Sequence, residues 1–270
     1  RRSDQLHDDL SLMAQLLLKG HPIGNFQGVL FDKDGTLSHS EPHLLELAEC
    51  RMTTALDLWI ATGRSPHPEL RTLLSRAFGL EKNALDPGGT LAVAARQDNL
   101  ISTATVFCLL GCSWPEALNL AEACFARVDP AAKASNRSSS SPLLSHARGT
   151  LQHLKGAGMQ LAVISNDTRS GIESFLEDHG LSTLFSSCWS ADDQPRKPNP
   201  DAVHELCRSL NIPPKHCVLL GDAETDLSMA RAAGVGIVIG YTGGWARQPE
   251  LPSADHLLAD WKDLGIAATP

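Results

Sequence analysis

The chain has 270 residues, of which 42% are hydrophobic and 20% charged, so it is long enough to bury a substantial core. This composition excludes a disordered or fibrous protein. Lys and Arg total 23 against 31 Asp and Glu, and the formal net charge of -8 repels nucleic acids and anionic membranes, so we expect neither as a partner. No apolar run approaches the ~20 residues that cross a bilayer, which predicts a soluble protein.

At the N-terminal end, the apolar residues between positions 4 and 19 recur at helical spacing before Gly20, Pro22 and Gly24, which predicts a surface helix. The seven cysteines are scattered along the chain and form no C-x-x-C pair. This pattern argues against a zinc site and favours reduced thiols, so we predict a cytoplasmic location.

Four short apolar runs each end in a polar or glycine-containing cluster, at residues 28–32, 161–164, 217–220 and 236–239. Helical patterns alternate with the later runs, at residues 143–156, 169–179, 200–210 and 225–233. This alternation predicts an α/β fold with a Rossmann-like parallel sheet and helices on both faces. Because ligands bind at the carboxyl ends of such strands, we expect Asp32, Ser165 and Asp222 to converge there.

Residues 41–141 interrupt this alternation and are mostly helical in pattern. Helix-like spacing covers residues 42–61, 68–79, 98–110 and 115–128. The segment from 129 to 141 is rich in small polar residues and is either a linker or a long surface loop. We interpret 41–141 as a helical cap domain inserted after the first strand, and 1–40 with 142–270 as one discontinuous α/β core domain.

Asp32 and Asp34 directly follow the first buried run, and Gly35 allows the chain to turn sharply there. Two carboxylates this close repel each other unless a cation lies between them, which favours a divalent ion with oxygen ligands, naturally Mg2+. Taken alone, the same residues are equally typical of a polar turn.

Three further clusters have the chemistry to complete a site. Ser165 and Asn166 offer polar groups just before a predicted helix, whose N-terminus favours an anion such as phosphate. Lys197 lies between prolines that restrict its backbone, and Asp222 and Asp226 follow another buried run. Each cluster alone is also typical of ordinary structure: an N-cap turn, an exposed lysine, or an acidic first helical turn.

Taken together, the four clusters resemble the motifs of the haloacid dehalogenase superfamily. The chain carries D-x-D-G-T-L at residues 32–37, a Ser after a strand at 165, a Lys at 197 and G-D-x-x-x-D at 221–226, in that order. The resemblance covers residues 26–40 and 143–260. It implies a core with a mobile helical cap of the C1 type, at the position of residues 41–141.

The resemblance also implies a mechanism and a cofactor. Asp32 would be the nucleophile that forms an aspartyl-phosphate, and Asp34 the general acid and base. Mg2+ would be held by Asp32, the main-chain carbonyl of Asp34 and Asp222, with Asp226 beyond the direct ligands.

In the same family, Ser165, the amide of Asn166 and Lys197 would neutralise the phosphoryl oxygens of the substrate. Asp34 argues for a phosphatase or a phosphomutase, because cation-pumping ATPases carry Thr at that position and dehalogenases lack the second Asp. The absence of a transmembrane run separately argues against a pump.

Substrate choice would lie in the cap. Residues 85–91 form a candidate specificity loop, and Arg64, Arg71 and Arg96 are candidates for a substrate carboxylate, although a solvated surface role is the alternative for each. His39, Glu41 and His43 flank the crossing into the cap, and we interpret them as hinge or surface residues. The tail at 254–264 resembles the closing strand and helix of phosphoglycolate phosphatase-like members.

The favoured hypothesis is a Mg2+-dependent phosphatase acting on a small phosphate ester such as 2-phosphoglycolate. A phosphomutase of the beta-phosphoglucomutase type would use the same intermediate but return the phosphate to a sugar. A non-catalytic phosphometabolite-binding protein is the third possibility. Binding of a phosphate ester without turnover would favour it.

Overall fold

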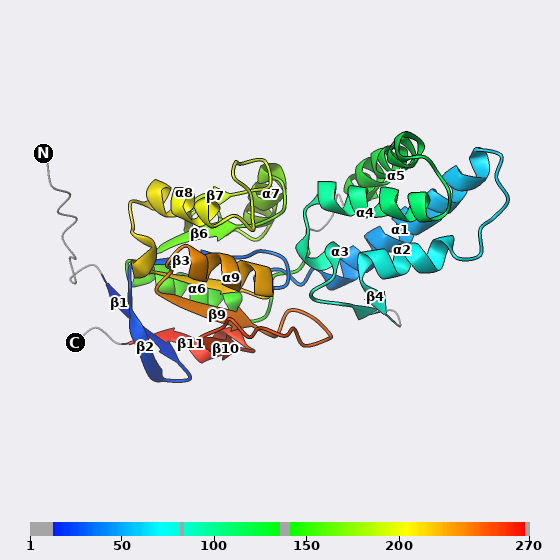
Figure 1. Cartoon of the computed structure of the whole chain (residues 1–270). Coiled ribbons are helices and arrows are strands. Elements are labelled where there is room, and N and C mark those ends of the chain that lie inside the picture. The colour runs from blue at the N-terminus through cyan, green and yellow to red at the C-terminus, as the bar shows by residue number, and fades with distance from the viewer. Residues whose placement is uncertain (1–12, 82–83, 136–140, 268–270) are drawn as a thin grey trace, which may run out of the picture.

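The computed structural model describes residues 13–81, 84–135 and 141–267. It has two lobes, one built around β-strands and one made mainly of helices (Figure 1). The strands are β1 (Ala14–Leu18), β2 (His21–Phe26), β3 (Gly28–Phe31), β4 (Leu80–Glu81), β5 (Ala84–Leu85), β6 (Gln160–Ile164), β7 (Phe185–Trp189), β8 (Cys217–Gly221), β9 (Ile237–Tyr241), β10 (His256–Leu258) and β11 (Leu264–Ile266). The α-helices are α1 (Glu41–Ala61), α2 (Leu70–Phe78), α3 (Thr90–Val93), α4 (Arg96–Leu109), α5 (Trp114–Ser135), α6 (Ala147–Gly156), α7 (Arg169–Asp178), α8 (Pro200–Leu210) and α9 (Glu224–Ala232).

The strand-containing lobe is organised around a six-stranded parallel sheet with the order β10-β9-β8-β3-β6-β7. Side chains alternate between its faces, as the period of a strand requires. Val29 and Phe31 join the hydrophobic cluster formed with α6 and α7, whereas Leu30 joins the cluster formed with α8 and α9. The predicted α/β fold, with helices on both faces of a parallel sheet, is therefore confirmed.

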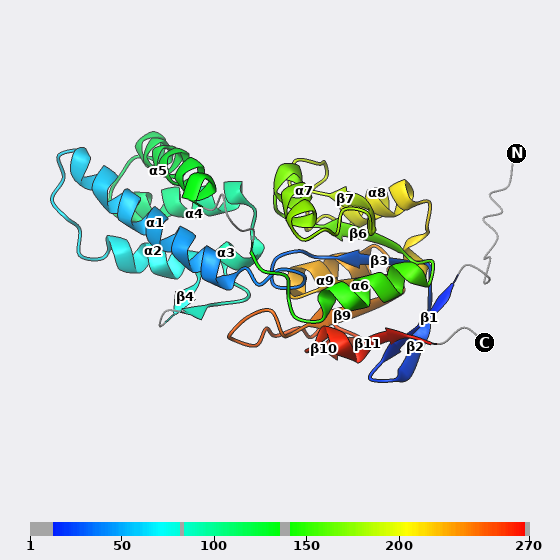
Figure 2. The same cartoon turned by 180° about the vertical axis from the view of Figure 1, so that it is seen from behind.

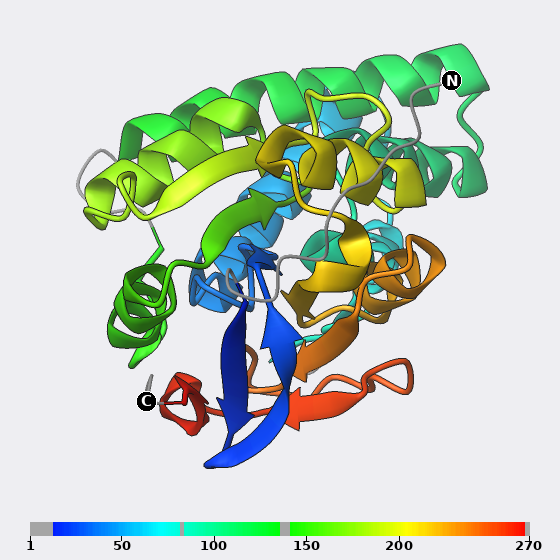
Figure 3. The ribbon, with the colours of Figure 1, turned by 90° about the vertical axis from the view of Figure 1, so that its left-hand side faces the viewer.

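The predicted N-terminal helix is wrong over its described part. Residues Ala14–Leu18 form β1, which pairs with β2 and β11 in a three-stranded antiparallel sheet. The β1–β2 turn consists of Lys19 and Gly20, both with positive φ (50° and 80°), as two-residue hairpin turns require. Leu16 is buried against the parallel sheet while its neighbours are more exposed, so strand burial outweighs the helical spacing. Figure 3 shows the β1–β2 hairpin on the side of this lobe that faces away from the helical lobe.

The helical lobe occupies the chain between β3 and α6 and has its own hydrophobic core (Figure 2). Helices α1, α2, α4 and α5 match the four predicted helical segments, and α5 continues seven residues past the predicted end at 128. The predicted linker or loop at 129–141 is therefore wrong over residues 129–135, which are helical, and residues 136–140 lie outside the described ranges. The short strands β4 and β5 form a small hairpin against α2.

The connections into and out of the helical lobe lie side by side. Ser38 and Leu143 form an antiparallel bridge, and the main-chain N–H of Leu144 donates to the carbonyl of Leu37 at 2.8 Å. A second hydrogen bond, from the N–H of His39 to the carbonyl of Pro142, is also 2.8 Å long. The first connection leaves from the carboxyl end of β3 and the second returns beside it to α6, so the helical lobe stands over the edge of the sheet where the predicted site residues lie.

Candidate active site

Three neighbouring strands bring the predicted residues to one edge of the sheet. β3 pairs with β6 on one side and with β8 on the other, and Phe31 is in register with Val163 and with Leu220. Asp32, Ser165 and Asp222 therefore follow adjacent parallel strands at their carboxyl ends, as predicted. All three are buried.

Lys197 lies at the centre of this cluster. Its ammonium group is 2.7 Å from Asp32 Oδ1 and 2.8 Å from Asp226 Oδ2, and it also donates to the carbonyl of Ile164 at 3.3 Å. The Lys197 side chain is 3% exposed. Burial alone would favour the neutral amine, but the two carboxylates outweigh it and raise the pKa of Lys197 above its usual range. The lysine is therefore a fixed cation, and its contacts join β3, β6 and α9.

Asp222 lies directly against the loop that carries Asp32 and Asp34. Thr36 Oγ1 donates to Asp222 Oδ1 at 2.8 Å, and a Cβ atom on Gly35 would collide with the Asp222 carboxylate. Gly35 also has a φ of +77°, so a side chain at this position is excluded on two grounds. The side chains of the first and the last motif thus meet, as the sequence predicts.

Trp245 is a further site residue that the sequence analysis missed. Its indole N–H donates to Asp222 Oδ2 at 2.6 Å. The signal available in the sequence was the pair Gly243 and Gly244 after a buried strand, which is typical of close backbone approach. A Cβ atom on Gly244 would overlap the carbonyl of Gly35.

Asp34 faces a second buried lysine. Lys33 Nζ lies 2.7 Å from Asp34 Oδ1 and 3.2 Å from Asp167 Oδ2, and Ser40 Oγ also donates to Asp34. Burial of Asp34 opposes its ionisation, but Lys33 and Ser40 outweigh burial and hold the pKa of Asp34 below its usual value. Lys33 is thus the charge partner of Asp34.

The turn after β6 contains the predicted anion-binding residues. Ser165 Oγ accepts from the N–H of Asp167 at 3.1 Å, and α7 begins at Arg169 with Thr168 as its N-cap. The side chain of Asn166 turns toward the helical lobe, where its amide donates to the carbonyl of Val93 at 2.9 Å. The Asn166 side chain therefore joins the two lobes, which the sequence analysis did not anticipate.

Glu41 makes another contact between the lobes. One carboxylate oxygen accepts from the N–H of Leu85 at 3.2 Å and the other from the N–H of Ala246 at 2.7 Å. Glu41 is only 5% exposed and connects β5 to the loop after β9, so it is not a surface residue as one of the two expectations had it.

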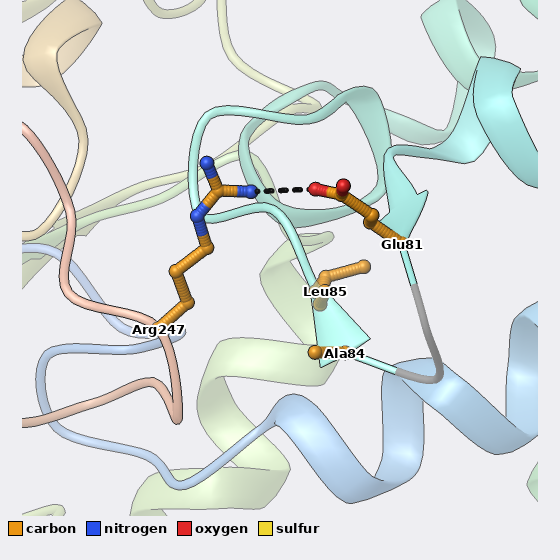
Figure 4. Close-up of a pocket in the computed structure, with 4 residues that line it drawn as sticks. All are labelled: Glu81, Ala84, Leu85 and Arg247. Carbon is orange, nitrogen blue, oxygen red and sulfur yellow. Dashed lines mark hydrogen bonds and ion pairs between the residues drawn. The ribbon is translucent and has the colours of Figure 1, made fainter.

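A pocket of about 260 Å³ lies beside this contact, lined by Glu81, Ala84, Leu85 and Arg247 (Figure 4). Arg247 crosses the pocket to reach Glu81 at 3.3 Å. Both side chains are more than half exposed, so this ion pair contributes little stability.

The three arginines proposed for a substrate carboxylate pair within the helical lobe. Arg64 contacts Glu116, Arg71 contacts Glu49, and Arg96 contacts Asp129. These ion pairs engage all three guanidinium groups within the helical lobe, and the alternative stated for each was a solvated surface role.

The site fits a divalent cation in its donor chemistry. Asp32, Asp222 and Asp226 are three buried carboxylates, and the one buried ammonium group of Lys197 pairs with two of them, Asp32 and Asp226. Burial, then the nearby carboxylates of Asp32 and Asp226, raise the pKa of Asp222 well above its usual range. Within the described ranges, no group of three or more His, Cys, Asp or Glu side chains is arranged as a metal site. Two carboxylates with a main-chain carbonyl are nevertheless an oxygen donor set suited to Mg2+.

Solved structures share the fold of this chain. A predicted phosphoglycolate phosphatase from Haemophilus somnus superposes with a TM-score of 0.63 at 22% identity, covering 88% of this chain and 96% of that one. A candidate beta-phosphoglucomutase from Thermotoga maritima gives 0.54 at 16% identity, covering 88% and 96%. At these identities the likeness shows the fold alone, an α/β fold with a Rossmann-like parallel sheet.

The chain belongs to the haloacid dehalogenase-like hydrolases, because the model of that family matches residues 26–234. Its sequence is also similar to two proteins named phosphoglycolate phosphatase. The protein of Colwellia psychrerythraea is 35% identical over 98 residues, which are 35% of this chain and 43% of the relative. The protein of Escherichia coli K12 is 32% identical over 108 residues, covering 38% and 43%. The matched stretch spans less than half the length of these relatives.

Proposed function

We propose that the chain is a Mg2+-dependent phosphatase that hydrolyses a small phosphate monoester, with 2-phosphoglycolate as the favoured substrate. The observation that carries the proposal is the contact of Lys197 with both Asp32 and Asp226, 2.7 and 2.8 Å away, at the strand edge that also holds Asp222. This edge combines a nucleophilic carboxylate, a fixed cation and a site of excess negative charge.

Asp32 acts as the nucleophile in this proposal. One oxygen of its carboxylate attacks phosphorus, the bond between phosphorus and the leaving oxygen breaks, and an aspartyl-phosphate forms. Water then attacks the same phosphorus, the bond to Asp32 breaks, and phosphate leaves with the carboxylate restored. Lys197 holds Oδ1 of Asp32 in place, so the carboxylate is oriented before the substrate arrives.

Asp34 moves the proton in both steps. It gives a proton to the leaving oxygen in the first step and takes one from the attacking water in the second. Lys33 and Ser40 favour its ionised form, which is the form that accepts a proton. The negative charge of a bound phosphate ester raises the pKa of a neighbouring carboxyl, which favours the protonated form for the first step.

The phosphoryl oxygens are neutralised by Lys197, the hydroxyl of Ser165 and the main-chain N–H of Asn166. A cation held by Asp32, the main-chain carbonyl of Asp34 and Asp222 would add electrostatic stabilisation of the negative charge on the phosphoryl oxygens. Asp226 acts indirectly, through its contact with Lys197.

The proposal also includes the division of the chain into domains. Residues 41–141 form a cap that covers the site, and residues 1–40 with 142–270 form the core. The separate hydrophobic cluster of the helical lobe supports this division. The similarity to phosphoglycolate phosphatases supports 2-phosphoglycolate as the substrate.

A cytoplasmic location completes the proposal, supported by seven cysteines that are all free thiols. Within the described part of the chain, no helix is both long enough and apolar enough to span a membrane.

The test is release of inorganic phosphate from 2-phosphoglycolate and from an aryl phosphate, with and without added Mg2+. We expect Mg2+-dependent release that is abolished in Asp32→Asn and retained in Asp57→Asn, which changes an exposed carboxylate of α1 in the same way. Equal release by Asp32→Asn would refute the assignment of the nucleophile. Transfer of phosphate from one sugar position to another, without release to water, would support a phosphomutase instead.

A further inference from the structure

One side chain belongs both to the helical lobe and to the candidate metal site. Trp245, in the loop between β9 and β10, is 7% exposed and packs in the hydrophobic cluster of the helical lobe. From the same position its indole N–H donates to Asp222 Oδ2 at 2.6 Å. The packing of the helices and the orientation of this carboxylate are therefore joined through a single residue.

The main chain around Trp245 is fixed on both sides. On one side, Gly244 lies so close to Gly35 that a Cβ atom there would overlap the Gly35 carbonyl. On the other side, the N–H of Ala246 donates to Glu41 at the start of α1. The indole therefore has a defined place between the two lobes.

Asp222 is held at both of its carboxylate oxygens. Thr36 Oγ1 donates to Oδ1 at 2.8 Å, while Trp245 donates to Oδ2. A carboxylate oxygen has two lone pairs, so each one retains acceptor capacity for a cation. Donors that orient a metal-binding carboxylate in this way strengthen the affinity of a site for its metal.

We infer that Trp245 is a positioning residue that couples Mg2+ binding at Asp222 to the seating of the helical lobe on the core. The inference rests on the proposed function, since it takes Asp222 as a cation ligand. Because coupling between two events is reciprocal, Mg2+ binding stabilises the seated position of the helices by the same factor that seating strengthens Mg2+ binding.

Trp59 provides a matched control. It is 4% exposed in the same hydrophobic cluster, where its ring stacks on Phe107 with centroids 6.2 Å apart. Its indole N–H donates to the carbonyl of Ser65, away from the carboxylates. Trp59→Phe thus removes the same atoms as Trp245→Phe from the same core and leaves Asp222 untouched.

The first experiment is calorimetric titration of the full chain with Mg2+ in the absence of substrate. We expect about 10- to 100-fold weaker binding in Trp245→Phe and unchanged binding in Trp59→Phe. Tryptophan fluorescence gives a second measurement. Mg2+ should change the emission of the wild type and of Trp59→Phe but not that of Trp245→Phe. Equal Mg2+ affinity of the two variants, or an emission change that survives in Trp245→Phe, would overturn the inference.

Hydrogen exchange measures the other side of the coupling. Mg2+ should slow exchange of the amides of Leu85 and Ala246, the two donors to Glu41, in the wild type but not in Trp245→Phe. Unchanged exchange in the wild type would refute the link to the helical lobe. If the wild type bound no Mg2+, the metal site of the proposed function would fail as well. If the wild type and both variants bound it equally, only the role of Trp245 would fail.

Discussion

Replacement of Lys197 by Met tests the electrostatic organisation of the site. Met has a similar length and no charge, so Lys197→Met keeps most of the packing and leaves Asp32 and Asp226 without their shared counter-ion. The two carboxylate side chains are 9% and 6% exposed, which gives them little access to water. Removal of one partner from a buried ion pair costs about 3–5 kcal/mol.

The expected loss can be read as a change in Tm. For a chain of this size, 1 kcal/mol corresponds to roughly 2–4 °C, so Lys197→Met should lower Tm by roughly 10 °C. The assay is thermal unfolding followed by circular dichroism at neutral pH, with a chelator to remove divalent cations. Lys262→Met is the matched control, because Lys262 is a 63% exposed lysine in an ion pair with Asp260 and its loss should cost under about 1 kcal/mol.

The double variant Lys197→Met/Asp226→Asn separates charge from packing. It removes one of the two uncompensated carboxylates, so it should recover part of the stability that Lys197→Met loses. A Tm of Lys197→Met equal to that of Lys262→Met would refute the electrostatic reasoning. A double variant no more stable than Lys197→Met would assign the loss to packing.

Three other predictions concern stability. Glu41→Gln should lower the free energy of unfolding by about 1–3 kcal/mol, because the side-chain amide has only one oxygen and cannot accept from both N–H groups that the carboxylate binds. Glu46→Gln, on the exposed face of α1, is the control and should leave the free energy of unfolding in urea unchanged. Equal effects of the two substitutions would contradict this prediction. Gly244→Ala should lower Tm, because the added Cβ atom would overlap the main-chain carbonyl of Gly35. Gly149→Ala should raise Tm, because its Cβ atom would point into open space and Ala favours a helix such as α6. The reverse order of the two Tm values would refute this prediction. Burial raises the pKa of Asp226 to about 6, so the folded chain retains a proton that the unfolded chain releases above about pH 4. The unfolding free energy of the wild type relative to Asp226→Asn should therefore fall as the pH rises from about 4 to about 6 in urea titrations with chelator, and a rise would disprove it.

The parallel sheet was predictable because its strands are buried on both faces. Such strands form continuous apolar runs, and residues 28–31 or 217–220 stand out from their polar surroundings. The residues that follow them lie together for a topological reason, since parallel neighbours end at the same edge. Strand β7 was missed because its sequence, FSSCW, has polar residues at its centre, at the edge of the sheet.

The antiparallel sheet was not predictable from spacing alone. Leu16, Leu17 and Leu18 satisfy a helical pattern as well as a strand pattern, and only the burial of Leu16 against the core decides between them. The turn at Lys19 and Gly20 was the one local signal of a hairpin.

Within the site, the motif residues were predictable and their supports were not. Trp245 and Glu41 act through contacts made between distant parts of the chain, which no local spacing reveals. Trp245 lies 23 residues from Asp222, and Glu41 lies 205 residues from Ala246. These partners depend on how the loops after β3, β8 and β9 pack against one another and against the helical lobe, and that is a property of the tertiary structure.

The paired connections at Ser38 and Leu143 have an evolutionary consequence. Since the chain leaves the sheet and returns to it at almost the same point, everything between can be lengthened, shortened or replaced without changing the order of the strands. Recombination at two neighbouring positions could then deliver a new specificity module to an unchanged reaction centre. The main-chain hydrogen bonds between these two connections would hold each replacement domain in the same place on the sheet.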